Sequence, residues 1–109
     1  MSVREILIKA KEILNQHGWA QNYYRCKDGV FLSEAIQEAG GYKPIGTGFM
    51  LEPNSNAFKA HQFIETLVGM KVHKFNDDKN RTKEDIIKVL DEAIEAVFWL
   101  ETEASSWLK

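Results

Sequence analysis

The sequence has a single cysteine, Cys26, among its 109 residues. No disulfide can form within the chain, and zinc sites built on paired cysteines are excluded. Because this cysteine content suits a reducing compartment, we expect a cytoplasmic protein.

Long apolar runs are also lacking. The N-terminal stretch MSVREILIKAKEIL interleaves its apolar residues with charged ones, which are Arg4, Glu5, Lys9, Lys11 and Glu12. A signal peptide needs an uninterrupted apolar core, and a bilayer span needs roughly 20 apolar residues. Neither pattern is present, so we expect no membrane partner.

Assembled catalytic and metal motifs are missing as well. No serine lies in a nucleophile elbow, and the segment Gly46-Thr47-Gly48 lacks the Gly-Lys-Ser/Thr of a phosphate loop. The three histidines have no i, i+4 spacing, and none is close in sequence to Cys26. We therefore predict no catalytic residue, no metal and no cofactor, and we favour a binding protein over an enzyme.

The residues that are present predict one helical domain spanning 1–109. The chain is 44% hydrophobic and 28% charged, which is typical of a globular protein. Its net charge of −2 argues neither for nor against a nucleic-acid partner.

Four segments have the apolar spacing of helices, namely residues 2–17, 30–39, 55–68 and 82–103. Ser2 and Glu5 have capping-box spacing at the start of the first segment, and Gly18 suits a left-handed stop after its last residue. The expected inward residues of the third segment are Phe58, Phe63, Ile64, Leu67 and Val68; the inward face of the last reaches Leu100. We predict an all-α fold of about four helices, with a short β-hairpin at 40–56 or 70–76 as an open alternative.

The polar stretch KFNDDKNRTKEDII, residues 74–87, invites comparison with a calcium loop. An EF-hand loop needs glycine at its sixth position and glutamate at its twelfth, and no register here supplies both. Thr82 and Asp85 have capping-box spacing instead, and Asn76 and Asp77 favour Asx turns that lead into the cap. The basic residues of the loop leave an anion site, or contact with nucleic acid, as less favoured alternatives.

The segment AIEAVFWL, residues 93–100, has only Glu95 as a polar residue. A helix that is apolar nearly all round is buried on two sides. Its second side would be covered by an overlying loop such as residues 40–56, by another protomer or by another protein, and a two-fold dimer is the favoured account. The predicted interface residues are Phe98, Trp99 and Trp107.

Two segments, ILNQHGWAQ and FNDDKNRTKEDIIKVLDEAI, resemble a family of small uncharacterised proteins found in actinobacteria and phages. The shared motifs are His-Gly-Trp-x-Gln, here residues 17–21, and an aromatic-Asn-Asp segment followed by Arg-Thr, here residues 75–82. The middle helix departs from the family, because Val30-Phe31-Leu32 stands where a Cys-Ala-x-Gly-Ala-like run is usual. The resemblance implies a fold and a phage origin but no activity.

The same resemblance implies that the two motif segments meet in space. A polar clasp between the terminal helices is the favoured interpretation, and a ligand pocket is the alternative. The candidate ligand-binding residues are His17, Trp19, Gln21, Asn76, Asp77 and Arg81.

Three functional hypotheses follow. The first is a non-catalytic accessory protein that acts by protein–protein interaction. The second is a ligand-binding protein or small enzyme with a polar pocket near His17 and Asp77. The third is a nucleic-acid binder or mimic, for which the last helix supplies an acidic face.

Overall fold

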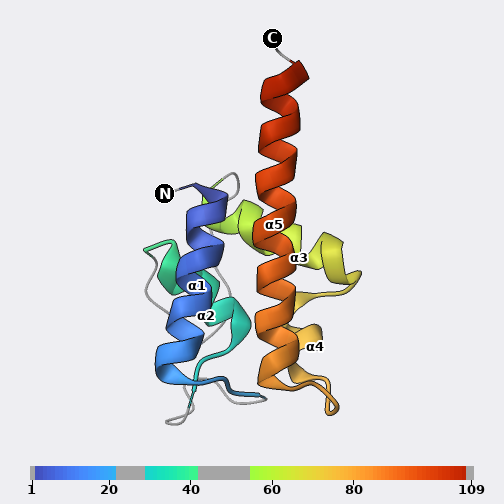
Figure 1. Ribbon diagram of the computed structural model, residues 1–109. Coiled ribbons are helices and arrows are strands. Elements are labelled where there is room, and N and C mark those ends of the chain that lie inside the picture. The colour runs from blue at the N-terminus through green and yellow to red at the C-terminus, as the bar shows by residue number, and fades with distance from the viewer. Residues whose placement is uncertain (1, 22–28, 42–54, 108–109) are drawn as a thin grey trace.

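The computed structural model describes residues 2–21, 29–41 and 55–107, with the side chains of the last helix described as far as Leu100. This part of the chain forms five helices: α1 (Val3–His17), α2 (Leu32–Ala39), α3 (Asn56–Val68), α4 (Val72–Asp77) and α5 (Lys83–Trp107). Figure 1 shows α1 and α5 side by side and running in opposite directions, with the shorter helices packed around their lower parts. The predicted all-α fold is confirmed.

The hairpin alternative at 70–76 is wrong, because this segment contains helix α4. Its buried residues are Val72, Phe75 and Asn76, and the spacing i, i+3, i+4 is that of a helix face. The other hairpin alternative, at 40–56, falls almost wholly on residues 42–54, which lie outside the described residues.

Helix α1 starts with the predicted capping box. Glu5 N donates to Ser2 Oγ at 3.1 Å, and Ser2 N donates to the Glu5 carboxylate at 3.3 Å. Gly18 ends the helix with φ 81° and ψ 172°, so its ψ is extended and not left-handed helical as predicted. Only glycine adopts this combination of φ and ψ readily, which explains why a glycine follows the helix at this position.

Helix α5 starts with the second predicted capping box. Asp85 N donates to Thr82 Oγ1 at 3.2 Å, and Thr82 N donates to the Asp85 carboxylate at 3.0 Å. The helix continues to Trp107, one turn beyond the predicted end near Glu103. At 1.5 Å per residue its 25 residues span about 37 Å, against about 22 Å for the 15 residues of α1. The last turns of α5 therefore project beyond the other helices (Figure 1).

The core is formed by side chains from all five of these helices. Its largest fully buried aliphatic side chains are Leu7, Leu14, Leu32, Ile36, Ile64, Ile86, Leu90 and Val72. Helix α3 buries Ala57, Ala60 and Ile64, and Phe63 and Val68 pack against the core, so the predicted inward face is correct in part. Leu67 is 42% exposed, because small alanines let α3 approach the core closely and the larger apolar residues fall to the sides.

A short bridge connects the chain after α1 to the chain before α2. Ala20 N donates to Val30 O at 3.1 Å, and Val30 N donates to Gly18 O at 2.9 Å. The two segments are so close that a Cβ on Gly29 would lie 2.6 Å from the carbonyl carbon of Trp19. Glycine is required here, and the bridge fixes Trp19 beside α4.

Candidate functional site

Asn76, in the last turn of α4, is the polar centre where the two motif segments meet. It is only 2% exposed. Its Oδ1 accepts hydrogen bonds from Trp19 Nε1 at 2.7 Å and from Leu32 N at 3.0 Å. Its Nδ2 donates to Ala20 O and to the Asp77 carboxylate, both at 3.0 Å. One amide side chain thus connects the α1–α2 connection, the start of α2 and α4.

The hydrogen-bonding capacity of the Asn76 side chain is fully used. A carboxamide oxygen offers two lone pairs and its nitrogen offers two hydrogens, and all four have partners within the chain. A buried amide with every bond satisfied holds segments together and has nothing left for a ligand. The geometry therefore gives Asn76 a structural role.

Gln21 and Arg81 surround the same junction. Gln21 Nε2 donates to Asn76 O at 2.9 Å and to Asp78 O at 2.7 Å. Arg81 Nε donates to Phe75 O at 3.0 Å, and its guanidinium lies 3.7 Å from the centre of the Phe75 ring. Both side chains bind carbonyls at the end of α4, where the last turn of a helix leaves its C=O groups without partners. We call Trp19, Gln21, Asn76 and Arg81 the Asn76 junction.

Two predicted site residues differ from this group. His17 is exposed at the end of α1, and none of the described hydrogen bonds of the Asn76 junction involves it. Asp77 borders the junction, where its carboxylate accepts a hydrogen bond from Asn76 Nδ2. The Asx turn predicted at Asn76 and Asp77 is made instead by Asp78, whose carboxylate accepts from Asn80 N at 2.9 Å, because the two earlier residues belong to α4.

The second candidate site is an exposed apolar group on α5, which we call the apolar tip: Phe98, Trp99 and Leu100. These residues are 45%, 55% and 56% exposed, although all are large and apolar. The Phe98 and Trp99 rings meet edge to face, with centroids 5.7 Å apart. Leu100 was predicted to face inward, but α5 has passed the end of the core at this point. The side chain of Trp107, the third predicted interface residue, lies outside the described part.

Arg4 of α1 borders the apolar tip. Its guanidinium lies 5.4 Å from the centre of the Phe98 ring. Its Nε is buried and has no hydrogen-bond partner among the described residues. Arg4 therefore places a cation beside the Phe98 ring at the edge of the tip.

Membrane and metal chemistry find no support in the described residues. None of the described helices combines the length and apolarity of a bilayer-spanning segment. Likewise, the described histidine and acidic side chains form no group of three that could coordinate an ion.

A family model described as a family of unknown function, DUF6197, matches residues 1–96. The chain belongs to this family. No match was found among curated proteins, and none among solved structures. The match includes both segments on which the sequence resemblance rests, whereas an origin in actinobacteria or phages stays a prediction.

In this DUF6197 protein the two candidate sites relate differently to the family match. The Asn76 junction lies wholly within residues 1–96, and the apolar tip lies beyond them.

One candidate site was missed by sequence reasoning. A cavity of about 520 Å³ lies beside α3 and includes His61, Glu65, Lys71 and His73. The only signal in the sequence was the i, i+4 spacing of His61 and Glu65, which is typical of a surface pair. Nothing in the spacing showed that the turn after α3 brings Lys71 and His73 back beside them.

Proposed function

We propose that this DUF6197 protein is a cytoplasmic, non-catalytic accessory protein that acts by protein–protein interaction, and that a second copy of the chain covers its apolar tip. The observation that carries the proposal is the exposure of Phe98, Trp99 and Leu100 in consecutive positions. Scattered apolar residues are normal on a surface, but a contiguous group on a projecting helix marks an interaction site. A phage origin stays a prediction from the resemblance.

The register of α5 supports a helical partner. Its buried residues Ile86, Leu90, Ala93 and Val97 follow one another at alternating steps of four and three. This is the a/d spacing of a coiled-coil seam. The same steps lead on to Leu100, Ala104 and Trp107, and the helical backbone continues through all three positions. The stripe that packs on α1 within the chain therefore continues where no other described helix covers it.

The register further favours an antiparallel pair. If two copies of α5 cross near residue 102, position 97 lies opposite 107 and position 100 lies opposite 104, which pairs a with d positions. The two helical bodies then lie at opposite ends and do not collide. The C-terminal turn of each α5, with its unpaired carbonyls and negative dipole end, comes close to Arg4 of the other copy.

The exposed area indicates a dimer of modest affinity. Side chains of this size cover roughly 150–250 Å² each, so about half of three such side chains is about 300 Å² per copy. At about 25 cal/mol per Å², two copies gain about 15 kcal/mol before the cost of association. That cost is about 4–15 kcal/mol, which leaves a net gain between about 0 and 11 kcal/mol. A micromolar dissociation constant, which corresponds to about 8 kcal/mol, lies within this range and sets the concentrations of the test. The remaining turns of α5 supply the additional area that a specific interface needs.

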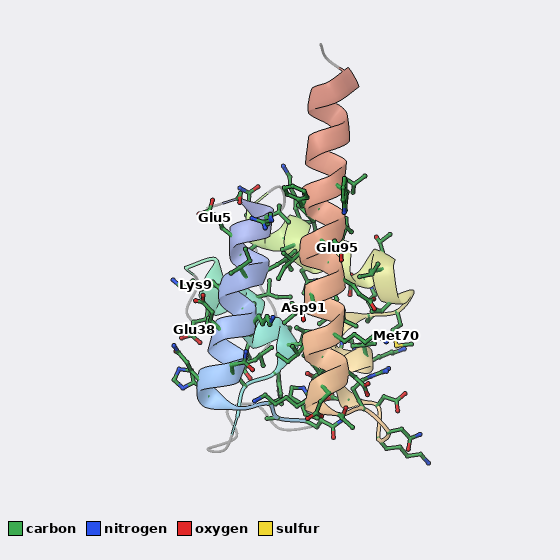
Figure 2. All side chains as sticks on the ribbon, in the orientation of Figure 1. Glu5, Lys9, Glu38, Met70, Asp91 and Glu95 are labelled. Atoms are coloured by element: carbon green, nitrogen blue, oxygen red, sulfur yellow. The ribbon has the colours of Figure 1, made fainter. Side chains whose placement is uncertain are left out.

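Light scattering after size-exclusion chromatography tests the proposal. At about 100 μM, well above a micromolar dissociation constant, the wild type should have twice the chain mass of 12.5 kDa. Leu100→Glu should return it to the monomer mass, because Leu100 lies in the seam and a charge there opposes burial. Met70→Glu is the matched control, since Met70 is 42% exposed but lies at the turn after α3, away from the tip (Figure 2). A monomeric wild type, or a Leu100→Glu variant with unchanged mass, would contradict the proposal.

A further inference from the structure

The cavity beside α3 differs from the apolar tip in position and in chemistry. It has a volume of about 520 Å³ and is lined by Ser33 from the start of α2, by Phe58, His61 and Glu65 from α3, and by Lys71 and His73 from the start of α4. Pockets for small molecules commonly measure about 300–1,000 Å³ and combine an apolar wall with a few convergent polar groups. Phe58 supplies the apolar wall here, and the remaining residues supply the polar groups.

His61 is the least solvated titratable group of this cavity. Its side chain is 14% exposed, and its Nδ1 lies 3.9 Å from the Glu65 carboxylate. Burial lowers the pKa of His61 below its ordinary value, with smaller lowering by Lys71 and His73 and an opposing effect of Glu65. A desolvated histidine beside a charged partner in a cavity is a functional-site candidate.

Glu65 is already engaged by the protein. Its Oε2 accepts a hydrogen bond from Val72 N at 3.0 Å, which fixes the turn between α3 and α4. The other oxygen faces His61. The Glu65 carboxylate therefore forms part of the cavity wall, and Val72 N and His61 offset part of its negative charge.

Lys71 and His73 have no such partner. Both side chains are exposed at the rim, and within the described part of the chain neither forms an ion pair. Lysine carries three donors and a full positive charge, and histidine adds a donor and, when protonated, a second charge. The groups at this rim with unused capacity are thus donors and cations.

We propose that this cavity binds a small organic anion with an aromatic or apolar body, whose carboxylate or phosphate is held by Lys71 and His73 and whose body packs on Phe58. The site is independent of the apolar tip, so either assignment can fail without the other. Its charge changes with pH, because protonation of His61 adds a positive charge beside the opposite charges of Lys71 and Glu65. Binding therefore strengthens as pH falls.

NMR of the histidine rings tests this site with three probes of similar size: phenyl phosphate, benzoate and phenol. The anions should shift the ring signals of His61 and His73 and raise the pKa of His61, because an anion favours the charged imidazole. Phenol, which lacks the charge, should not. A response to phenyl phosphate alone assigns the ligand to phosphates, and a response to benzoate as well extends the site to carboxylates. Equal responses to phenol and to the anions, or no response, would overturn the proposal.

Matched lysine variants locate the contact. Lys71→Gln should weaken binding of the responding anion about five-fold, as expected for the loss of roughly 1 kcal/mol from one exposed charge. Lys74→Gln removes the same charge from the same helix, but Lys74 is not part of this cavity, and the affinity should change by less than about two-fold. His73→Gln, which changes the other polar side chain at the rim, should also weaken binding of the anion. Equal weakening by Lys71→Gln and Lys74→Gln would show only a general charge effect and would overturn the assignment.

Discussion

Removal of the Asn76 side chain should be among the most destabilising single changes in this protein. In Asn76→Ala, Trp19 Nε1, Leu32 N and Ala20 O each lose their hydrogen-bond partner. A buried polar group left unpaired costs about 1–3 kcal/mol. Three such groups, partly relieved by water that enters the space, give about 3–5 kcal/mol.

That loss is large against the roughly 5–15 kcal/mol that stabilises an ordinary domain. For a chain of this length it corresponds to a decrease in Tm of about 15–30 °C. Thermal and urea unfolding followed by circular dichroism would measure it, with all variants at one protein concentration because self-association adds concentration-dependent stability.

Two further variants test whether the loss of stability in Asn76→Ala comes from its hydrogen bonds. Asn76→Asp keeps the shape and the Oδ1 acceptor but loses the donor to Ala20 O. It also places a second negative charge beside Asp77, so it should be strongly destabilised as well. Asn80→Ala changes an exposed asparagine in the following turn and should alter the free energy of unfolding by less than about 0.5 kcal/mol. If Asn76→Ala is as mild as Asn80→Ala, the Asn76 junction does not hold the fold together.

Three further outcomes follow from particular contacts. Gly29→Ala should lower the free energy of unfolding by about 1–3 kcal/mol, because its Cβ would overlap the Trp19 backbone; a Tm equal to that of the wild type would refute this close approach. Because the pKa of His61 is lowered in the folded state, the unfolded chain takes up the proton first, and the free energy of unfolding should fall as pH drops below about 6.5. His61→Gln should flatten this pH dependence in urea unfolding. The same pH dependence in the variant and the wild type would contradict the prediction. Arg4→Gln should weaken self-association about five-fold in sedimentation equilibrium through the loss of about 1 kcal/mol, while Lys9→Gln on the same helix should not; equal effects would remove Arg4 from the interface.

Helix boundaries with local signals were predictable from the sequence. The capping boxes at Ser2 and Thr82 depend on residues three apart, so their spacing predicts their geometry directly. Gly18 was predicted as a stop, but its backbone angles were not, because they depend on the bridge that the next segment makes with Val30.

Features that depend on tertiary packing were harder to predict from the sequence. Helix α4 is six residues long, too short for a periodic pattern to be distinguished from alternation. The inward face of α3 was predicted in part: Ile64 is buried as expected, but Leu67 is exposed and the buried Ala57 and Ala60 were not predicted. Small residues give a weak signal in any pattern that ranks positions by hydrophobicity.

In the candidate sites, too, local features were predictable and features that depend on tertiary packing were not. The meeting of Trp19 with the segment around Asn76 was suggested by the motifs, but the completeness of the Asn76 hydrogen bonds depends on Leu32 and Ala20, which carry no signal of their own. The cavity at His61 depends on a turn that returns Lys71 beside α3. Such a return cannot be derived from spacing along the chain.

The central claim, that a second copy covers the end of α5, is tested most directly by amide hydrogen exchange of residues 97–107. Exchange would be measured at about 1 μM and about 200 μM, on either side of a micromolar dissociation constant. We expect slower exchange of this segment at the higher concentration, with α1 amides unchanged, and no such slowing in Leu100→Glu. Fast exchange of residues 97–107 at both concentrations in the wild type would contradict it.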